Sequence, residues 1–186
     1  MKINLFRLIR SSLIGVGLAV IILIFVVQPV RISGQSMQPT FRDGEYAILS
    51  KLSHTFNRLP EHGDVVAIDP RTNRNRSIND DFMELFKNGI AKIKGNPPSR
   101  TIWMKRVIGL PGDTIEFRDG SHVFRNGKPL EEPYIVEPMK YQNKHIYTVP
   151  DDAIFVLGDN RNHSVDSRYI GCVPINHVVG TIILKL

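Results

Sequence analysis

The stretch "TIWMKRVIGLPGD", residues 101–113, indicates the fold of this chain of 186 residues. Its β-branched and aromatic residues favour a strand, and "PGD" supplies the turn that ends it. Successive side chains of a strand point to opposite faces, so Lys105 shares a face with Trp103 and Val107. Where that face is the core, the Lys105 ammonium loses its water and its pKa falls.

The segments on either side continue the pattern of short strands separated by turns. They are "EYAILSKL", "GDVVAIDP", "AIFVLGDN" and "HVVGTIILKL". "TIEFRDGSHVFRNGKPL" is hairpin-like, with Asp119-Gly120 and Asn126-Gly127 as turn dipeptides. Apolar residues make up 42% of the chain, which is enough for one core. We therefore expect a mainly β fold, antiparallel and partly closed into a barrel-like body.

The N-terminus carries an uncharged apolar run, "LIGVGLAVIILIFVV", at residues 13–27. Extended to residues 11–30, it is long enough to span a bilayer as a helix. Lys2, Arg7 and Arg10 precede it, so the positive-inside rule keeps residues 1–10 in the cytoplasm and residues 31–186 on the far side. A cleavable secretory signal has the same layout, but no A-x-A site follows the run. A buried core helix is a third alternative, disfavoured because the run is apolar on every face.

Residues 71–100 form a polar insertion in the domain that follows the anchor. Within it, residues 80–94 favour a helix capped by Asn79 or Asp80. The apolar side chains of this helix fall on one stripe, namely Phe82, Leu85, Phe86, Ile90 and Ile93. The stripe packs on the domain surface or rests on the bilayer.

Charge and cysteine content narrow the class of protein. The net charge of +6 is scattered with little aromatic interleaving, which disfavours a nucleic-acid partner and suits an anionic membrane or an ordinary basic surface. Cys172 is the only cysteine of the sequence, which excludes an intrachain disulfide and a cysteine metal cluster. We interpret it as a small buried residue and expect neither a metal nor a cofactor.

Three segments carry residues suited to catalysis: "SGQSMQPTF", "MKRVIGLPGD" and "GDNRNHSVDSR". A neutral Lys105 can act as general base for a serine, so a Ser-Lys dyad is one candidate. A Ser-His-Asp triad is the other, because the chain has six histidines and His163 lies near a polar cluster. Taken singly, a serine beside glycine is typical of a turn, and a "GDNRN" run is typical of a hydrogen-bonded loop. A single lysine in an apolar strand usually extends its amine to the surface.

In this order, the three segments resemble the sequence boxes of the type I signal peptidases, membrane-anchored serine proteases that remove signal peptides from exported proteins. "GEYAILSKL" and "GDVVAI" resemble the boxes between them, and the resemblance covers most of the chain from Ile32 onward. It implies a serine endopeptidase with Ser36 as nucleophile and Lys105 as general base. The cut would follow small residues in an Ala-x-Ala pattern.

The resemblance also implies supporting residues, namely Ser164, Asp166, Arg168, Arg106 and Asp159. Ser164 is expected to hydrogen-bond the amine of the general base and direct it toward the nucleophile. Asp166 and Arg168 are expected to pair and brace that loop. Arg106 and Asp159 are expected to be structural partners.

Two further parts of a site follow from the resemblance. The Ser36 N–H is expected to donate to the oxyanion, and the position of a second donor in some relatives is Gly34 here. The residues expected to line shallow substrate pockets are Val30, Ile32, Met37 and Met104.

The expected partners are preproteins that carry signal peptides and a lipid bilayer, with the enzyme as a monomer. The membrane is a cell membrane or an organelle membrane such as the thylakoid. Repressor-type auto-cleaving domains also use serine and lysine, but they lack a membrane span. A membrane-anchored β domain that binds exported peptides without cutting them is the alternative from another class.

Overall fold

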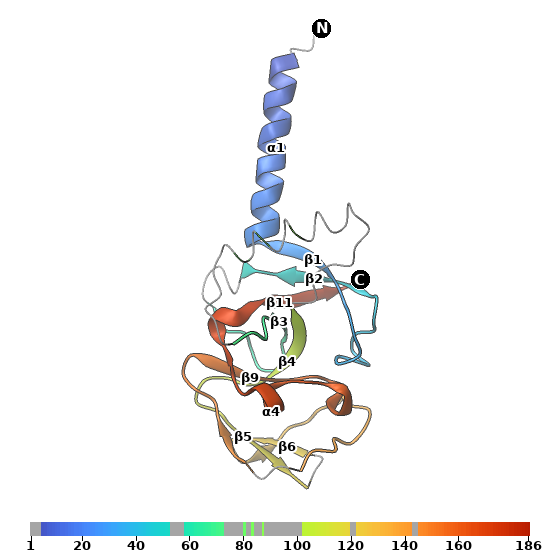
Figure 1. The fold of residues 1–186 in the computed structure, drawn as a ribbon, viewed down its shortest axis with the longest axis vertical. Helices are drawn as coiled ribbons and strands as arrows, with labels where there is room; N and C mark the ends of the chain where they lie inside the picture. Colours follow the sequence, from blue (N-terminus) through green and yellow to red (C-terminus); the bar gives the residue numbers. More distant parts are fainter. Residues whose placement is uncertain are drawn as a thin grey trace.

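The computed structural model describes residues 5–52, 58–72, 80, 83, 87, 102–119, 122–142 and 145–186. Helix α1 (Leu5–Phe25) projects from a body of β-strands, with the N-terminus at its far end (Figure 1). The window Phe6–Leu23 has a mean hydropathy of 1.9, and none of it is buried against the rest of the protein. Its length and composition are compatible with a membrane anchor.

The helix ends earlier than the sequence predicted. We expected the span to include residues 26–30, but β1 (Val27–Arg31) begins there and pairs with β2 (Tyr46–Ser50), from Val27↔Ser50 to Arg31↔Tyr46. The expectation was wrong because a run of β-branched residues suits a strand as well as a helix. Pro29 also lacks the N–H that a helix interior requires. The body therefore begins directly after α1.

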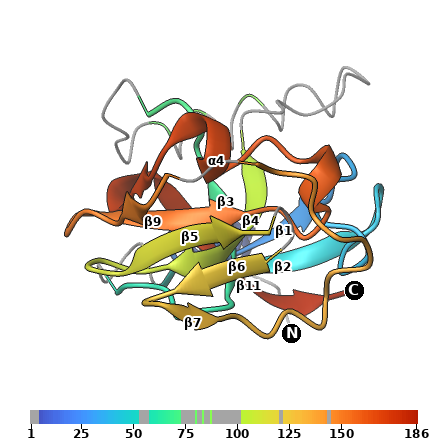
Figure 2. The same cartoon turned by 90° about the horizontal axis from the view of Figure 1, so that it is seen from below.

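Two antiparallel sheets build the body (Figures 1 and 2). The larger has the order β1-β2-β11-β3-β4-β9-β10, with β11 at Val178–Lys185, β3 at Val65–Ile68, β4 at Trp103–Gly109, β9 at Ala153–Leu157 and β10 at Val173–Pro174. The smaller has the order β7-β6-β5-β8, with β7 at Lys128–Pro129, β6 at His122–Arg125, β5 at Thr114–Arg118 and β8 at Tyr147–Thr148. Within the described residues, β1 and β10 end the larger sheet without pairing to each other. The mainly β, antiparallel and partly closed fold is thus confirmed.

Strand β9 is buried on both faces and separates two hydrophobic clusters. Ile154 and Val156 pack in the cluster of the larger sheet, whereas Phe155 and Leu157 pack in the cluster beneath the smaller sheet. Because successive strand residues alternate between faces, this one strand is shared by both layers. The segment that follows β9, beginning at Gly158, therefore starts between the two clusters.

The turns behave as expected, while some short elements were not foreseen. Asp119 and Asn126 adopt positive φ values of 54° and 53°, as hairpin turns require. The elements not foreseen include the two-residue strands β8 and β10, the short helix α4 (Ser167–Ile170), and the 3-10 turns η1 (Arg161–His163) and η2 (Ile175–His177). The helix expected within residues 80–94 lies outside the described residues, apart from single positions.

Candidate active site

Ser36 lies in the loop between β1 and β2, and this loop is anchored on both sides of the serine. Ile32 and Met37 are buried, and the Phe41 N–H donates to the Met37 carbonyl at 2.9 Å. The Asn160 N–H donates to the Ser36 carbonyl at 3.0 Å. The nucleophile candidate therefore sits on a loop that is pinned by buried side chains and by the segment after β9.

Lys105 comes from the middle of β4, where it pairs with Val66 of β3. It is only 3% exposed, and its Nζ donates to Ser36 Oγ at 3.0 Å. The same Nζ lies 5.5 Å from the centroid of the Trp103 ring, which covers one side of the amine. The fold thus brings a lysine and a serine into contact across 69 positions of sequence.

Burial lowers the pKa of Lys105 from 10.5 to about 8, because an ammonium without water is penalised. The carboxylates of Asp166 and Asp159 act in the opposite direction, while Arg168 lowers the pKa further. At pH 7 about a tenth of the amine is therefore unprotonated, far more than for a lysine in water. An amine in that state can accept a proton from a hydroxyl 3.0 Å away.

The segment after β9 makes a close main-chain approach at Gly158. A Cβ at this position would lie 2.2 Å from Ser164 Oγ and 2.6 Å from the Ser36 carbonyl oxygen. Such distances exclude any side chain larger than hydrogen. The absence of a side chain at Gly158 therefore allows the loop of Ser164 and the loop of Ser36 to pack against the same residue.

Ser164 is placed near the dyad but does not make the bond we expected. Its Oγ is buried and has no hydrogen-bond partner in the part of the chain that the structure describes. The expected bond from Ser164 to Lys105 is therefore absent from this structure, in which the lysine Nζ donates to Ser36 Oγ. An unsatisfied buried hydroxyl is uncommon in a folded protein.

Asp166 and Arg168 form a buried ion pair, with Arg168 Nε donating to Asp166 Oδ1 at 2.8 Å. Asp166 also accepts from the Gly158 N–H at 3.0 Å and caps α4. Arg168 donates to the Arg161 carbonyl at 2.6 Å. The pair therefore fixes both ends of the loop that carries Ser164.

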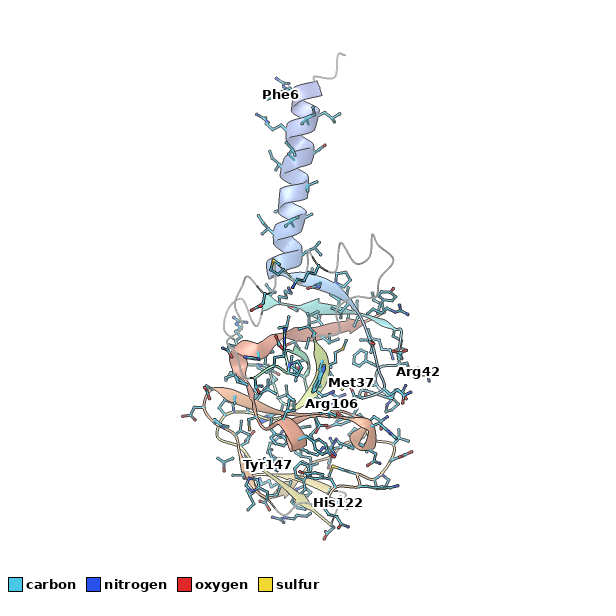
Figure 3. All side chains as sticks on the ribbon, viewed as in Figure 1. Phe6, Met37, Arg42, Arg106, His122 and Tyr147 are labelled. Carbon is cyan, nitrogen blue, oxygen red and sulfur yellow. The ribbon has the colours of Figure 1, made fainter. Side chains whose placement is uncertain are left out.

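Arg106 and Asp159 form a second pair, 2.6 Å between Nη2 and Oδ2, in which the carboxylate is fully buried. Thr40 in the Ser36 loop donates its hydroxyl to Asp159 at 2.5 Å. Figure 3 places Met37 and Arg106 at mid-height of the body, between the end of α1 and the smaller sheet marked by His122 and Tyr147. Arg106 thus links β4 and the segment after β9 to the loop between β1 and β2, which carries Ser36.

The chain matches the family described as signal peptidase, peptidase S26, over residues 5–186. It belongs to that family. A signal peptidase I from Leptolyngbya laminosa is 36% identical, over 95% of this chain and 77% of the relative. A probable signal peptidase I-1 from Synechocystis is 34% identical, over 90% of this chain and 75% of the relative. A solved signal peptidase I from Enterococcus faecalis aligns with a TM-score of 0.45 and 30% identity, over 67% of this chain and 97% of that chain.

Membership in the signal peptidase family makes the chain a serine peptidase. A serine peptidase needs a base near its serine, which directs attention to the partners of Ser36. The partner of Ser36 Oγ is Lys105, whereas His163, the histidine considered for a triad, is exposed on η1. Within the described residues, no group of three or more His, Cys, Asp or Glu side chains could hold a metal ion.

The two positions considered for an oxyanion site differ in their main-chain bonding. The Gly34 N–H donates to Asp43 Oδ1 at 2.8 Å, and Gly34 has a φ of +99°. The Ser36 N–H has no acceptor among the described residues. Of these two groups, only the Ser36 N–H is therefore available to a ligand in this structure.

The four residues expected at substrate pockets lie in one hydrophobic cluster. Ile32 and Met37 are 3% and 2% exposed and belong to the cluster interior, whereas Val30 and Met104 are only partly buried. The cluster contains residues of both β1 and β4 and of the nucleophile loop. Two of its members, Met37 and Met104, are the chain neighbours of Ser36 and Lys105.

Some contributors were not identified from the sequence. Gly158 was quoted within "GDNRN" but not given a role, and Thr40 was not considered. Glu132, Tyr134 and Arg161 were missed because their contacts join segments far apart in the chain. The sequence signal for Glu132 and Tyr134 is "EEPY", residues 131–134, in which two acids and a tyrosine flank a proline.

Proposed function

We propose that this protein is a membrane-anchored endopeptidase that removes signal peptides from exported preproteins, with Ser36 as nucleophile and Lys105 as general base. The observation that carries the proposal is the 3.0 Å contact between Lys105 Nζ and Ser36 Oγ, made by an amine that is 3% exposed. A lysine needs desolvation to act as a base near neutral pH, and this lysine has it.

The reaction begins when neutral Lys105 takes the hydroxyl proton of Ser36 and Ser36 Oγ attacks the scissile carbonyl. The Ser36 N–H donates to the oxyanion of the tetrahedral intermediate. Protonated Lys105 then gives the proton to the leaving amine, and the signal peptide remains bound to Ser36 as an ester. Lys105 next removes a proton from water, and the water oxygen attacks the ester carbonyl. As the bond between the carbonyl and Ser36 Oγ breaks, Lys105 returns the proton to Ser36 Oγ, and the released peptide acid ionises to a carboxylate.

Ser164 is kept in this proposal as a residue that positions the lysine. Once Ser36 carries the acyl group, its Oγ no longer has a proton to share with Lys105. The buried Ser164 hydroxyl, packed on Gly158 beside the Ser36 main chain, is then the available partner for the amine. The support for this role is that a buried hydroxyl without a partner costs about 1–3 kcal/mol.

The substrate is proposed to bind as an added strand. β1 is an edge strand, and β9 pairs with β4 only from Arg106 onward, so the described residues leave Trp103–Lys105 unpaired on that side. The half-buried Val30 and Met104 would meet alternate substrate side chains. Shallow pockets beside them would favour small residues of the Ala-x-Ala type at the first and third positions before the cut.

The anchor places this chemistry at a membrane surface. Arg7 and Arg10 lie near the start of α1, so we propose residues 1–10 at the cytoplasmic end, the apolar helix as the anchor and residues 31–186 as the extracytoplasmic peptidase domain. Tethering to the bilayer that holds the signal peptide raises the local concentration of substrate. We propose that this bilayer is a cell membrane, with an organelle membrane such as the thylakoid as the alternative. We also propose that the protein is a monomer and does not bind nucleic acid.

The test uses the full-length protein in lipid vesicles with a preprotein of known cleavage site. Ser36→Ala and Lys105→Ala are expected to abolish cleavage while preprotein binding persists. Ser33→Ala, in the same loop, and Lys128→Ala, on the exposed strand β7, are matched controls that should cleave normally. A wild-type protein that binds the preprotein without cutting it would support a peptide-binding module instead.

A further inference from the structure

Residues 131–140, here called the connecting segment, follow the smaller sheet and run along η1. The Lys140 N–H donates to Asn162 Oδ1 at 2.8 Å, and Asn162 Nδ2 donates to the Pro138 carbonyl at 3.1 Å. Neither contact involves the dyad. The other end of the segment, however, reaches two groups that support the dyad from different sides.

The first contact is a buried ion pair between Glu132 and Arg161. Arg161 donates from both terminal nitrogens to the carboxylate, at 2.5 and 3.0 Å, and the two side chains are 9% and 1% exposed. The remaining Nε of Arg161 donates to the Gly158 carbonyl at 3.0 Å. Glu132 therefore neutralises the guanidinium that holds Gly158 in place, and Gly158 is the residue on which the Ser36 and Ser164 loops meet.

The second contact is made by Tyr134. Burial raises the pKa of this tyrosine, so its hydroxyl stays protonated and donates to Glu132 Oε1 at 2.9 Å. Its ring centroid lies 4.0 Å from the guanidinium carbon of Arg106. That guanidinium pairs with Asp159, whose carboxylate accepts the Thr40 hydroxyl of the Ser36 loop.

We propose that Glu132 and Tyr134 are positioning residues for the Ser36–Lys105 dyad. They act through Arg161 and Gly158 on one side and through Arg106 and Asp159 on the other. The proposal rests on the proposed function of the dyad. Neither residue touches a reacting atom. Each restrains an arginine whose partners contact the loops that carry Ser36 and Ser164, and a displacement of about 1 Å at reacting groups can cost about 100-fold in rate.

The chain offers a matched control for the same side-chain chemistry away from the dyad. Arg118 pairs with Glu116 at 2.8 Å and lies 4.2 Å over the Phe124 ring. This arginine, carboxylate and aromatic trio sits on the smaller sheet, where Arg118 is 47% exposed. If Tyr134 acted only on folding, loss of its ring over Arg106 and loss of the Phe124 ring over Arg118 would have the same effect on kcat.

The experiment compares Tyr134→Leu, Tyr134→Phe and Phe124→Leu in the full-length protein in lipid vesicles. We expect Tyr134→Leu to lower kcat by about 10- to 100-fold with KM within about twofold, because the dyad is displaced while binding is kept. Tyr134→Phe keeps the ring over Arg106 and should stay within about threefold of wild type. Phe124→Leu should leave kcat unchanged. Equal kcat for Tyr134→Leu and Phe124→Leu would overturn the proposal.

A second measurement keeps the proposal independent of preprotein cleavage. Titration of the Lys105 amine by NMR should give a higher pKa in Glu132→Gln and Tyr134→Leu than in wild type, since a loosened site admits water. A Lys105 pKa equal to that of wild type in both variants would also overturn the proposal. Thermal unfolding of each variant fixes an assay temperature at which it is folded.

Failure of wild type to cleave would refute the proposed function, whereas the titration of Lys105 still tests the positioning.

Discussion

Gly158 packs against Ser164 so closely that a Cβ at position 158 would lie 2.2 Å from Ser164 Oγ. The same Cβ would lie 2.6 Å from the carbonyl oxygen of Ser36. Both distances are far inside van der Waals contact, and the second involves main chain, which cannot rotate away. The nucleophile loop and the loop after β9 therefore depend on one glycine for their mutual position.

Gly158→Ala should separate these loops and lower kcat by about 100-fold or more, because the Ser36–Lys105 distance must change. Steady-state cleavage of a preprotein by the full-length variant checks this. Gly17→Ala in α1, where a Cβ meets nothing within 4 Å, is the control and should cleave normally. Wild-type kcat in Gly158→Ala would mean that the contact is irrelevant to catalysis.

Lys105→Met should stabilise the protein while destroying its activity. Because burial lowers the pKa of Lys105 from 10.5 to about 8, the unfolded chain binds more protons than the folded one between these pH values. The free energy of unfolding of wild type therefore rises with pH across that window. Below pH 8 the folded state carries the full free-energy cost of burying a protonated lysine. We expect Lys105→Met to gain about 1–3 kcal/mol at neutral pH and to lose that advantage as pH approaches 10.5.

Fluorescence of Trp103, the only tryptophan of the sequence, reports unfolding next to this site. Lys128→Met on the exposed strand β7 serves as control, since Lys128 is exposed. A Lys105→Met variant less stable than wild type at neutral pH would show that the amine is not held desolvated.

Ser164→Ala should raise the free energy of unfolding by about 1–3 kcal/mol, because it removes a buried hydroxyl that has no partner among the described residues. We expect kcat to fall by about tenfold or more, since the acylated enzyme loses the proposed second partner of Lys105. Burst kinetics separate the two steps, and deacylation should be the slower one. If acylation and deacylation proceed at wild-type rates, Ser164 has no role in positioning the lysine.

Met104→Ala should widen the proposed substrate site, since Met104 is a half-buried member of the cluster beside the dyad. Preproteins with valine or leucine before the cut should gain about tenfold in kcat/KM relative to those with alanine. Cleavage of a matched set of preproteins measures this ratio. An unchanged ratio would place the specificity pocket elsewhere.

The central strands were predictable from sequence because short apolar runs ended at clear turn signals. This was true of β2, β3, β4, β9 and β11 and of the two hairpin turns. β1 was missed because it continues the apolar run of α1 without a polar break, so composition did not mark the change from helix to strand. The two-residue strands β8 and β10 have no period to detect.

The candidate site was predictable to the extent that its residues fall within recognisable segments. Strand alternation placed Lys105 on the buried face with Val107, and resemblance to a family supplied Ser36 as its partner. The network of Glu132, Tyr134 and Arg161 was not predictable, because its bonds join positions about 30 residues apart that no local pattern connects. The missing bond from Ser164 to Lys105 depends on side-chain direction, which sequence does not encode locally.

The pH dependence of kcat/KM tests the role of Lys105 most directly. The full-length protein in lipid vesicles should cleave a preprotein with a rate that rises with pH and reaches half its maximum near pH 8, where the buried amine loses its proton. A profile that is flat from neutral to mildly alkaline pH, or one that rises only near the ordinary lysine value of 10.5, would contradict a desolvated lysine as the base.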